Sequence, residues 1–386
     1  MPTTPQPPTS CSSASTTARL PADEEEEEED DDDTADLSDP TILAWTHTTG
    51  GYPRCLALTH VPAPSASAPL SPTQLLVRVR AAALNPLDIQ LMNVPLLWSL
   101  PYLSSVRKGI GADFAGEVLA AGRASGFSGG EEVFGIRLAG MGGGGTLQEV
   151  VTVDVGDGAG GVVVRKPRGW GWREAAAVPL AWLTARTCIA KCEGFVGEGE
   201  KGTVVVLGGS SAVGMWVVRL ARRKGWRVVA TCSARNEEFV REMGADVVVD
   251  YMRGGVRAAV EREAPDAVVD CVGGTECLGV ARKYITIVGD KTDKGMLGGA
   301  LTYLWNPQMV WRTLIGKLGC RSEVYECVNL ELRKDYLEEA LELEKDDIVI
   351  DSTFPFDRVE EALERLNSGR CRGKVVVEIG ALGGRL

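Results

Sequence analysis

The sequence lacks three features that would place it in a specialised class of protein. No apolar run approaches the ~18 residues that a helix needs to cross a bilayer, so we predict no membrane span. The ten cysteines have no paired short spacings, which argues against a secreted disulfide framework. Only two histidines are present, His47 and His60, so imidazole groups for metal binding or proton transfer are scarce. At 386 residues, 44% of them hydrophobic, the chain is long enough for two packed domains.

A bias in charge is also absent from most of the chain. The formal net charge of -12 comes from 53 acidic and 41 basic residues. Residues 1–40 hold thirteen of the acids and one base, Arg19, which leaves forty of each in residues 41–386. Because this remainder is balanced, it has no sign bias that would attract nucleic acid or repel an anionic cofactor. We therefore predict no nucleic-acid binding.

Residues 1–40 are predicted to be a disordered acidic tail. They are rich in proline, serine and threonine and then in acids, with an uninterrupted acidic run at 23–33, so they cannot bury enough apolar surface to fold. Such a run can also recruit a protein partner, and this alternative stays open. The tail has neither the apolar segment of a secretory signal nor the arginine-rich, acid-poor pattern of a mitochondrial presequence. We therefore expect a cytoplasmic protein.

The pattern of apolar residues changes near residue 173, which predicts two domains. Residues 41–172 contain short β-rich runs broken by glycine and proline. A helical segment follows at 174–192, and apolar strands then alternate with amphipathic helices, which predicts a parallel α/β sheet. The strands of this sheet are expected at 203–207, 227–232, 247–250, 267–271, 284–288 and 321–327, and a final strand, helix and strand at 348–354, 357–367 and 374–379. Six strands suit a doubly wound dinucleotide-binding sheet.

The segment 202–214 predicts a dinucleotide site. An apolar strand turns sharply into a helix, and Gly208, Ser211 and Gly214 occupy the three positions where the fingerprint calls for glycine. Small residues let the backbone approach a pyrophosphate, whose charge is met by N–H groups at the helix N-terminus. Ser211 departs from glycine, but its hydroxyl is small and able to donate to a phosphate.

The strand that follows favours NADPH over NADH as the cofactor. An NAD enzyme places Asp or Glu at the end of this strand, roughly 20 residues beyond the turn, to bind the ribose 2′-hydroxyl. Residues 230–236 contain no acid. Ser233 and Arg235 instead offer a hydroxyl and a guanidinium to a 2′-phosphate. Arg235 alone could be an exposed arginine at a helix start, so the missing acid is the stronger evidence.

Six motifs, in order, resemble those of the medium-chain dehydrogenase/reductase superfamily. They lie at residues 75–88, 111–118, 145–149, 178–185, 270–274 and 373–377. The resemblance extends over essentially all of residues 41–386. It implies an α/β fold class, with a GroES-like β-rich catalytic domain plus a doubly wound Rossmann domain that binds NADPH. The catalytic domain would comprise residues 41–173 and 346–386, and the Rossmann domain residues 174–345.

The zinc ligands of this superfamily have no counterparts in the chain. Zinc alcohol dehydrogenases use a Cys, a His-Glu pair and a further Cys or Asp, and zinc needs three or four such ligands around one point. Positions 85–86 read Asn-Pro and positions 112–113 read Ala-Asp, and no cysteine lies between Cys55 and Cys188. We therefore expect no metal and a zinc-independent enzyme.

Residues 232–233, 244–251, 284–288 and 353–356 resemble the quinone-oxidoreductase branch, in particular the reticulon-interacting NADPH oxidoreductases and their fungal relatives. This resemblance implies roles for individual residues. Ser210, Ala212 and Val213 would hold the pyrophosphate, Ser233 the 2′-phosphate and Tyr251 the adenine end, while Val272 and Val288 would border the nicotinamide. It also implies, by analogy, a homodimer and a mitochondrial location as an alternative to the cytoplasm.

The expected reaction is hydride transfer from NADPH to a quinone or an α,β-unsaturated carbonyl. This chemistry depends on stacking the acceptor against the nicotinamide and on a donor for the developing negative charge, so it needs no metal. Asn85 is the first candidate to face the acceptor, with Thr184 and Tyr102 as further candidates, although Asn85 could equally serve only as a turn residue before proline. Two alternatives stay open: a trans-acting enoyl reductase for acyl-thioester or polyketide substrates, and an NADPH-binding interaction protein whose catalysis is vestigial.

Overall fold

The computed structural model describes residues 40–48, 51–64, 69–93, 107–138, 144–156, 158, 160–197, 202–291, 298, 302–303, 306–319 and 322–380. The predicted acidic tail, except for residue 40, and Tyr102 lie outside these residues. No helix in the described ranges is long and apolar enough to cross a membrane.

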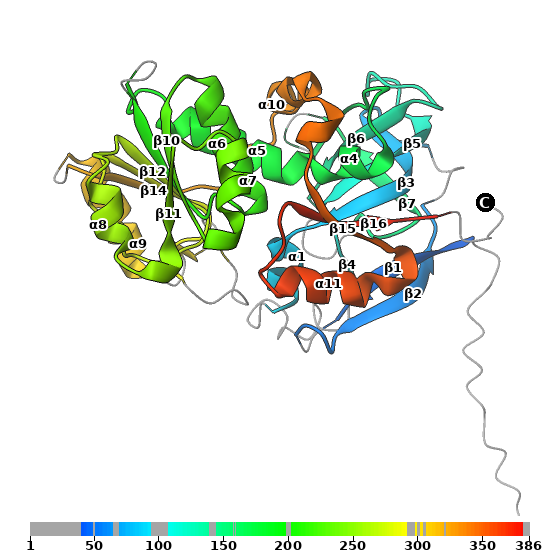
Figure 1. Ribbon diagram of the computed structural model, residues 1–386. Helices are drawn as coiled ribbons and strands as arrows, with labels where there is room; N and C mark the ends of the chain where they lie inside the picture. Colours follow the sequence, from blue (N-terminus) through cyan, green and yellow to red (C-terminus); the bar gives the residue numbers. More distant parts are fainter. Residues whose placement is uncertain are drawn as a thin grey trace, which may run out of the picture. The chain divides into compact units, whose positions relative to one another are not determined.

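A seven-stranded sheet combines strands from the first half of the chain with strands from its C-terminal end. Its strand order is β15-β16-β3-β5-β6-β8, and β7 pairs with β3. The strands are β3 (Gln74–Leu84), β5 (Asp113–Ala121), β6 (Glu132–Arg137), β7 (Val150–Asp154), β8 (Gly161–Arg165), β15 (Ile350–Pro355) and β16 (Lys374–Glu378). Strand β16 runs antiparallel to β3, with Val376 opposite Ala83, so the red C-terminal strand lies beside a cyan strand from the first third of the chain (Figure 1).

A smaller sheet completes this β-rich lobe. It has the order β2-β1-β4, formed by β1 (Thr41–His47), β2 (Leu56–Pro62) and β4 (Lys108–Gly109). An isolated bridge between Ala44 and Gln148 connects it to the segment that enters β7. The lobe is therefore assembled from residues at both ends of the described chain.

The second lobe is a six-stranded parallel sheet with the order β11-β10-β9-β12-β13-β14. Its strands are β9 (Thr203–Leu207), β10 (Arg227–Cys232), β11 (Val247–Asp250), β12 (Ala267–Asp270), β13 (Lys283–Thr286) and β14 (Val324–Cys327). In chain order this is 3-2-1-4-5-6, the doubly wound arrangement, with the reversal between β9 and β12. The predicted α/β class and the six predicted strands are confirmed.

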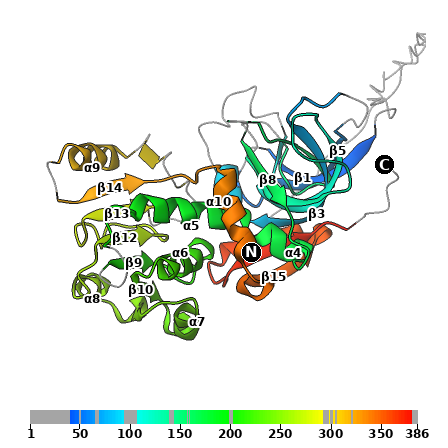
Figure 2. The ribbon, with the colours of Figure 1, turned by 90° about the horizontal axis from the view of Figure 1, so that it is seen from above.

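Helices cover both faces of this parallel sheet (Figure 2). The helices of the chain are α1 (Pro86–Met92), α4 (Trp172–Ala177), α5 (Pro179–Cys192), α6 (Ala212–Arg223), α7 (Glu237–Glu242), α8 (Val256–Glu261), α9 (Pro307–Lys317), α10 (Lys334–Glu338) and α11 (Val359–Asn367). Side chains of β9 alternate between the faces: Val204 and Val206 pack in the cluster that contains α5, α6 and α7, whereas Val205 packs with residues of α8 and α9. This alternation explains why the strand is apolar throughout.

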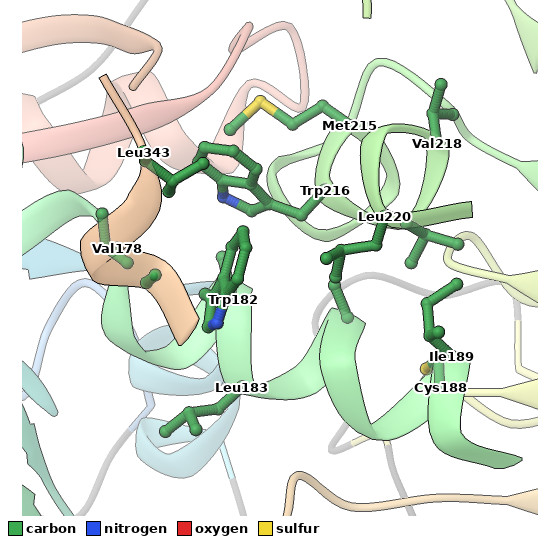
Figure 3. Close-up of a cluster of buried hydrophobic side chains, with 14 of the residues drawn as sticks. Val178, Trp182, Leu183, Cys188, Ile189, Met215, Trp216, Val218, Leu220 and Leu343 are labelled. Atoms are coloured by element: carbon green, nitrogen blue, oxygen red, sulfur yellow. The ribbon is translucent and has the colours of Figure 1, made fainter. Parts of the chain in front are cut away.

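Helix α5 links the two lobes, because it contacts β5 and β6 of the first sheet and β13 of the second. In its first turn Trp182 meets Trp216 of α6 edge to face, with ring centroids 5.3 Å apart and an interplanar angle of 77° (Figure 3). The Trp182 indole N–H donates to the Tyr336 carbonyl at 2.6 Å. The prediction of one helix over 174–192 is wrong: the segment forms α4 and α5, and Pro179, which has no N–H to donate, begins the second helix.

Candidate active site

A cavity of about 490 Å³ lies at the carboxyl ends of β9 and β10, beside the point where the strand order reverses. The parallel-sheet lobe contributes the turn that follows β9, and the β-rich lobe contributes Leu84, Asn85 and Lys374. In doubly wound sheets this crevice is the usual ligand site.

Most of the cofactor residues predicted from the sequence line this one cavity. Together with Asn85 they are Ser210, Ser211, Ala212, Ser233, Arg235, Tyr251 and Val272. Val213 follows Ala212 in the first turn of α6 but does not itself line the cavity. Val288 is not a lining residue either, but it stands against one, because a Cβ built at Gly273 would lie 3.1 Å from Val288 Cγ1. The contact of each residue with a cofactor stays a prediction.

The turn after β9 has the close packing that the glycine positions predict. Gly208 has φ +83°, and a Cβ there would lie 2.4 Å from Val272 Cγ1. A Cβ at Gly214 would lie 2.1 Å from the Gly208 carbonyl oxygen, so the helix can start this close to the strand only without a side chain. Ser211 replaces glycine because it is the N-cap of α6: its Oγ accepts a hydrogen bond from the Gly214 N–H at 3.0 Å. The preceding N–H groups of the helix are left to face an anion.

The end of β10 and the loop that follows it pack against this turn. The Gly208 N–H donates to Thr231 Oγ1 at 2.9 Å, and Asn236 Nδ2 donates to Ser210 Oγ at 3.1 Å. Ser233 is half-buried and Arg235 is exposed, and both line the cavity. The loop therefore places a hydroxyl and a guanidinium beside the turn that follows β9.

A buried polar network forms the wall contributed by the β-rich lobe. Lys374 Nζ lies 2.9 Å from Asp113 Oδ2 and also donates to Asn85 Oδ1, and the two charged side chains are 2% and 0% exposed. Asn85 Nδ2 donates to Asp113 Oδ2 at 3.0 Å, while Asp113 Oδ1 accepts from the Leu180 N–H of α5 at 2.8 Å. The Asn85 amide is thus fully engaged at both ends, so it does not stand free toward an acceptor.

A second carboxyl lies behind this network. Asp88 accepts hydrogen bonds from the N–H groups of Asn85 (2.7 Å) and Gly111 (3.2 Å). Burial raises the pKa of Asp88 to about 7. Asp88 therefore titrates near neutral pH while it holds the turn that carries Asn85.

Sequence reasoning missed Lys374 as a site residue. One signal was present, because a single basic residue opens the otherwise apolar strand 374–377 and an acid stands at position 113 in an apolar strand. Thr184, a further candidate for facing the acceptor, does not line the cavity, and its hydroxyl donates to the Leu180 carbonyl at 2.7 Å. The described ranges contain no group of three or more His, Cys, Asp or Glu side chains placed to share a metal ion.

Comparisons with known proteins agree with this architecture. Residues 71–167 match the alcohol dehydrogenase GroES-like domain, and residues 243–377 match a family described as zinc-binding dehydrogenase. The chain is 30% identical over 333 residues to mouse NAD(P)H oxidoreductase RTN4IP1, mitochondrial, covering 80% of this chain and 82% of the relative. It is 29% identical over 338 residues to a chloroplast envelope quinone oxidoreductase homolog of Arabidopsis thaliana, covering 85% and 95%.

The solved structure of the quinone oxidoreductase from Coxiella burnetii superimposes with a TM-score of 0.71 at 24% identity, covering 88% of this chain and all of that one, and shares the fold. The two relatives above carry organellar names, so the predicted cytoplasmic location stays a prediction. The sequence matches, the two-lobe architecture and the cavity at the strand reversal lead to one assignment. The chain is an oxidoreductase that belongs to the medium-chain dehydrogenase/reductase superfamily, in its quinone-oxidoreductase branch.

Proposed function

We propose that the chain is an NADPH-dependent, zinc-independent reductase that transfers hydride to a quinone or an α,β-unsaturated carbonyl. One observation carries the proposal: the cavity brings together the turn after β9, an acid-free loop with Ser233 and Arg235, and a wall that contains Lys374. These three parts suit the phosphates of the cofactor, its 2′-phosphate and an anionic transition state in turn.

The loop after β10 supports NADPH rather than NADH. The ribose of NADH needs a carboxylate acceptor at this strand end, and the nearest acid along β10 and its loop is Glu237, in the first turn of α7. Arg235 is a cationic donor and Ser233 a hydroxyl, and together they suit a dianionic 2′-phosphate, whereas neither is a carboxylate that would accept from a 2′-hydroxyl. Tyr251, about half exposed at the end of β11, supplies a ring for the adenine end.

The chemistry of the buried network supports a reaction without zinc. Each Asp113 oxygen already accepts a strong donor, from Lys374 and Asn85 on one side and from the Leu180 N–H on the other. Three of the roughly four lone-pair sites of the carboxylate are therefore occupied, and an ammonium group beside it would repel a divalent cation. The residues at positions 85 and 112 are asparagine and alanine, which offer zinc no thiolate or imidazole.

In the proposed mechanism, bound NADPH supplies the hydride, and the protein orients the acceptor and stabilises its charge. Lys374 has three N–H donors, of which two point to Asn85 and Asp113, so the third is available to an acceptor oxygen in the cavity. Asn85 and Asp113 hold the ammonium in place, and Leu84, Leu207 and Val272 give the cavity apolar walls. Apolar walls reduce the local dielectric, which strengthens the interaction of Lys374 with a developing oxyanion.

Stopped-flow measurement of NADPH oxidation against quinones, enones and enoyl thioesters in parallel tests the proposal. We expect turnover with quinones or enones. Exclusive turnover of enoyl thioesters would transfer the assignment to a trans-acting enoyl reductase. Tight NADPH binding without turnover of any acceptor would instead indicate a binding protein with vestigial catalysis.

A further inference from the structure

The loop that precedes β16 reaches the turn after β9 through a chain of side chains. Arg372 Nη2 donates to the Arg235 carbonyl oxygen at 3.2 Å and to Asn236 Oδ1 at 3.0 Å. Asn236 Nδ2 in turn donates to Ser210 Oγ at 3.1 Å. One residue therefore separates Arg372, in the β-rich lobe, from Ser210, in the turn predicted to hold phosphate.

Arg372 is held firmly at both ends. Its guanidinium lies over the Phe239 ring, 5.1 Å from the centroid, and its backbone N–H donates to Asp351 Oδ1 at 2.8 Å. Asp351 is itself fixed by two hydrogen bonds of 2.7 Å from Arg365. The Phe239 ring therefore supports the guanidinium of this exposed arginine beside Asn236, while Asp351 fixes its backbone.

The contact with Arg372 determines which way the Asn236 amide points. Arginine has donors and no acceptor, so the amide oxygen must face Arg372 and the amide nitrogen must face Ser210. The Ser210 oxygen then accepts a hydrogen bond, and its own hydrogen is left to be donated elsewhere. In the described part of the chain this is the hydroxyl's one hydrogen bond, and Ser210 lines the cavity.

We propose that Arg372 is a positioning residue, which orients the Ser210 hydroxyl through Asn236 as a donor to a phosphate group of the bound dinucleotide. The inference rests on the proposed function, because it needs a dinucleotide in the cavity. Arg372 would then be a determinant of cofactor affinity that lies in the β-rich lobe and does not itself contact phosphate. Without Arg372 the amide is free to turn over, and Ser210 then donates to Asn236 Oδ1 instead.

A double-mutant cycle with the adenosine-end probe 2′,5′-ADP tests the inference by calorimetry, independently of any hydride acceptor. Arg372→Ala and Ser210→Ala are each expected to weaken binding by about threefold to tenfold, the range for the net contribution of one ordinary hydrogen bond. In the Ser210→Ala background, Arg372→Ala is expected to cost nothing further, because the hydroxyl that it orients is gone. Arg358→Ala removes an exposed arginine of the same lobe, paired with Glu361 on α11, and is expected to leave binding unchanged.

Wild-type affinity in Arg372→Ala overturns the inference. So does an equal loss with and without the Ser210 hydroxyl, because it would mean that Arg372 acts through its charge or through the fold. If Arg372→Ala fails to fold, Arg372→Met, which keeps most of the aliphatic stem and removes the guanidinium donors, carries the same cycle with the same expected outcomes. If the wild-type protein binds neither 2′,5′-ADP nor NADPH, the proposed function itself is overturned, and the inference with it.

Discussion

Replacement of Lys374 by methionine tests the buried network most severely. Lys374 and Asp113 are 2% and 0% exposed with 2.9 Å between Nζ and Oδ2, so the substitution leaves a carboxylate buried without its cation. Removing one partner of a buried ion pair costs about 3–5 kcal/mol. The matched control is Lys334→Met, whose partner Glu338 lies 3.7 Å away, with 60% and 50% of the two side chains exposed. That change is expected to cost no more than about 0.5 kcal/mol.

Urea unfolding followed by circular dichroism gives the free energy of unfolding of each variant. Adding Asp113→Asn to Lys374→Met removes the unpaired charge while it keeps the shape of the side chain, so it should recover part of the loss. A loss for Lys374→Met no larger than that for Lys334→Met would refute the reasoning, because the ammonium would then be unnecessary to the buried carboxylate.

Three further predictions follow from the site. Burial raises the pKa of Asp88 from 3.8 to about 7, so the folded protein keeps a proton that the unfolded chain loses. The free energy of unfolding should therefore fall as pH rises from about 4 to about 7. Urea titrations of Asp88→Asn over the same pH range should show a smaller fall. Gly214→Ala places a Cβ 2.1 Å from the Gly208 oxygen, so it should lower the free energy of unfolding by about 1–3 kcal/mol and abolish the NADPH binding measured by calorimetry. Gly169→Ala, with open space around its Cβ, should do neither. Arg235→Ala should lower the ratio of kcat/KM for NADPH over NADH by about tenfold, and an unchanged ratio would remove Arg235 from the 2′-phosphate site.

Local patterns made most of the fold predictable. The six strands of the parallel sheet and the turn from Gly208 to Gly214 depend on residues close together in the chain, and the described strands agree with the predicted ones to within a few residues. The strand predicted to reach position 288 ends at Thr286, because Thr286 Oγ1 accepts the N–H groups of Val288 and Gly289 and turns the chain. Side-chain capping of this kind competes with strand pairing and is hard to see in an apolar run.

The buried network of Lys374, Asp113 and Asn85 could not be predicted from local sequence patterns. Lys374 and Asp113 are 261 residues apart, and their pairing depends on β16 and β5 flanking β3 in one sheet. Asn85 could be placed in a turn from its neighbours, but its engagement with both charged groups could not. The role of Ser211 was open to sequence reasoning, since serine at a helix start is a common N-cap.

The central claim is that the chain uses NADPH and does so without zinc. The most direct measurement is kcat/KM for NADPH and for NADH with one quinone acceptor, on protein before and after exhaustive chelation, with its metal content determined. We predict that NADPH is preferred by about tenfold or more and that chelation leaves the rate unchanged. A preference for NADH, or a rate lost on chelation and restored by zinc, would contradict the account.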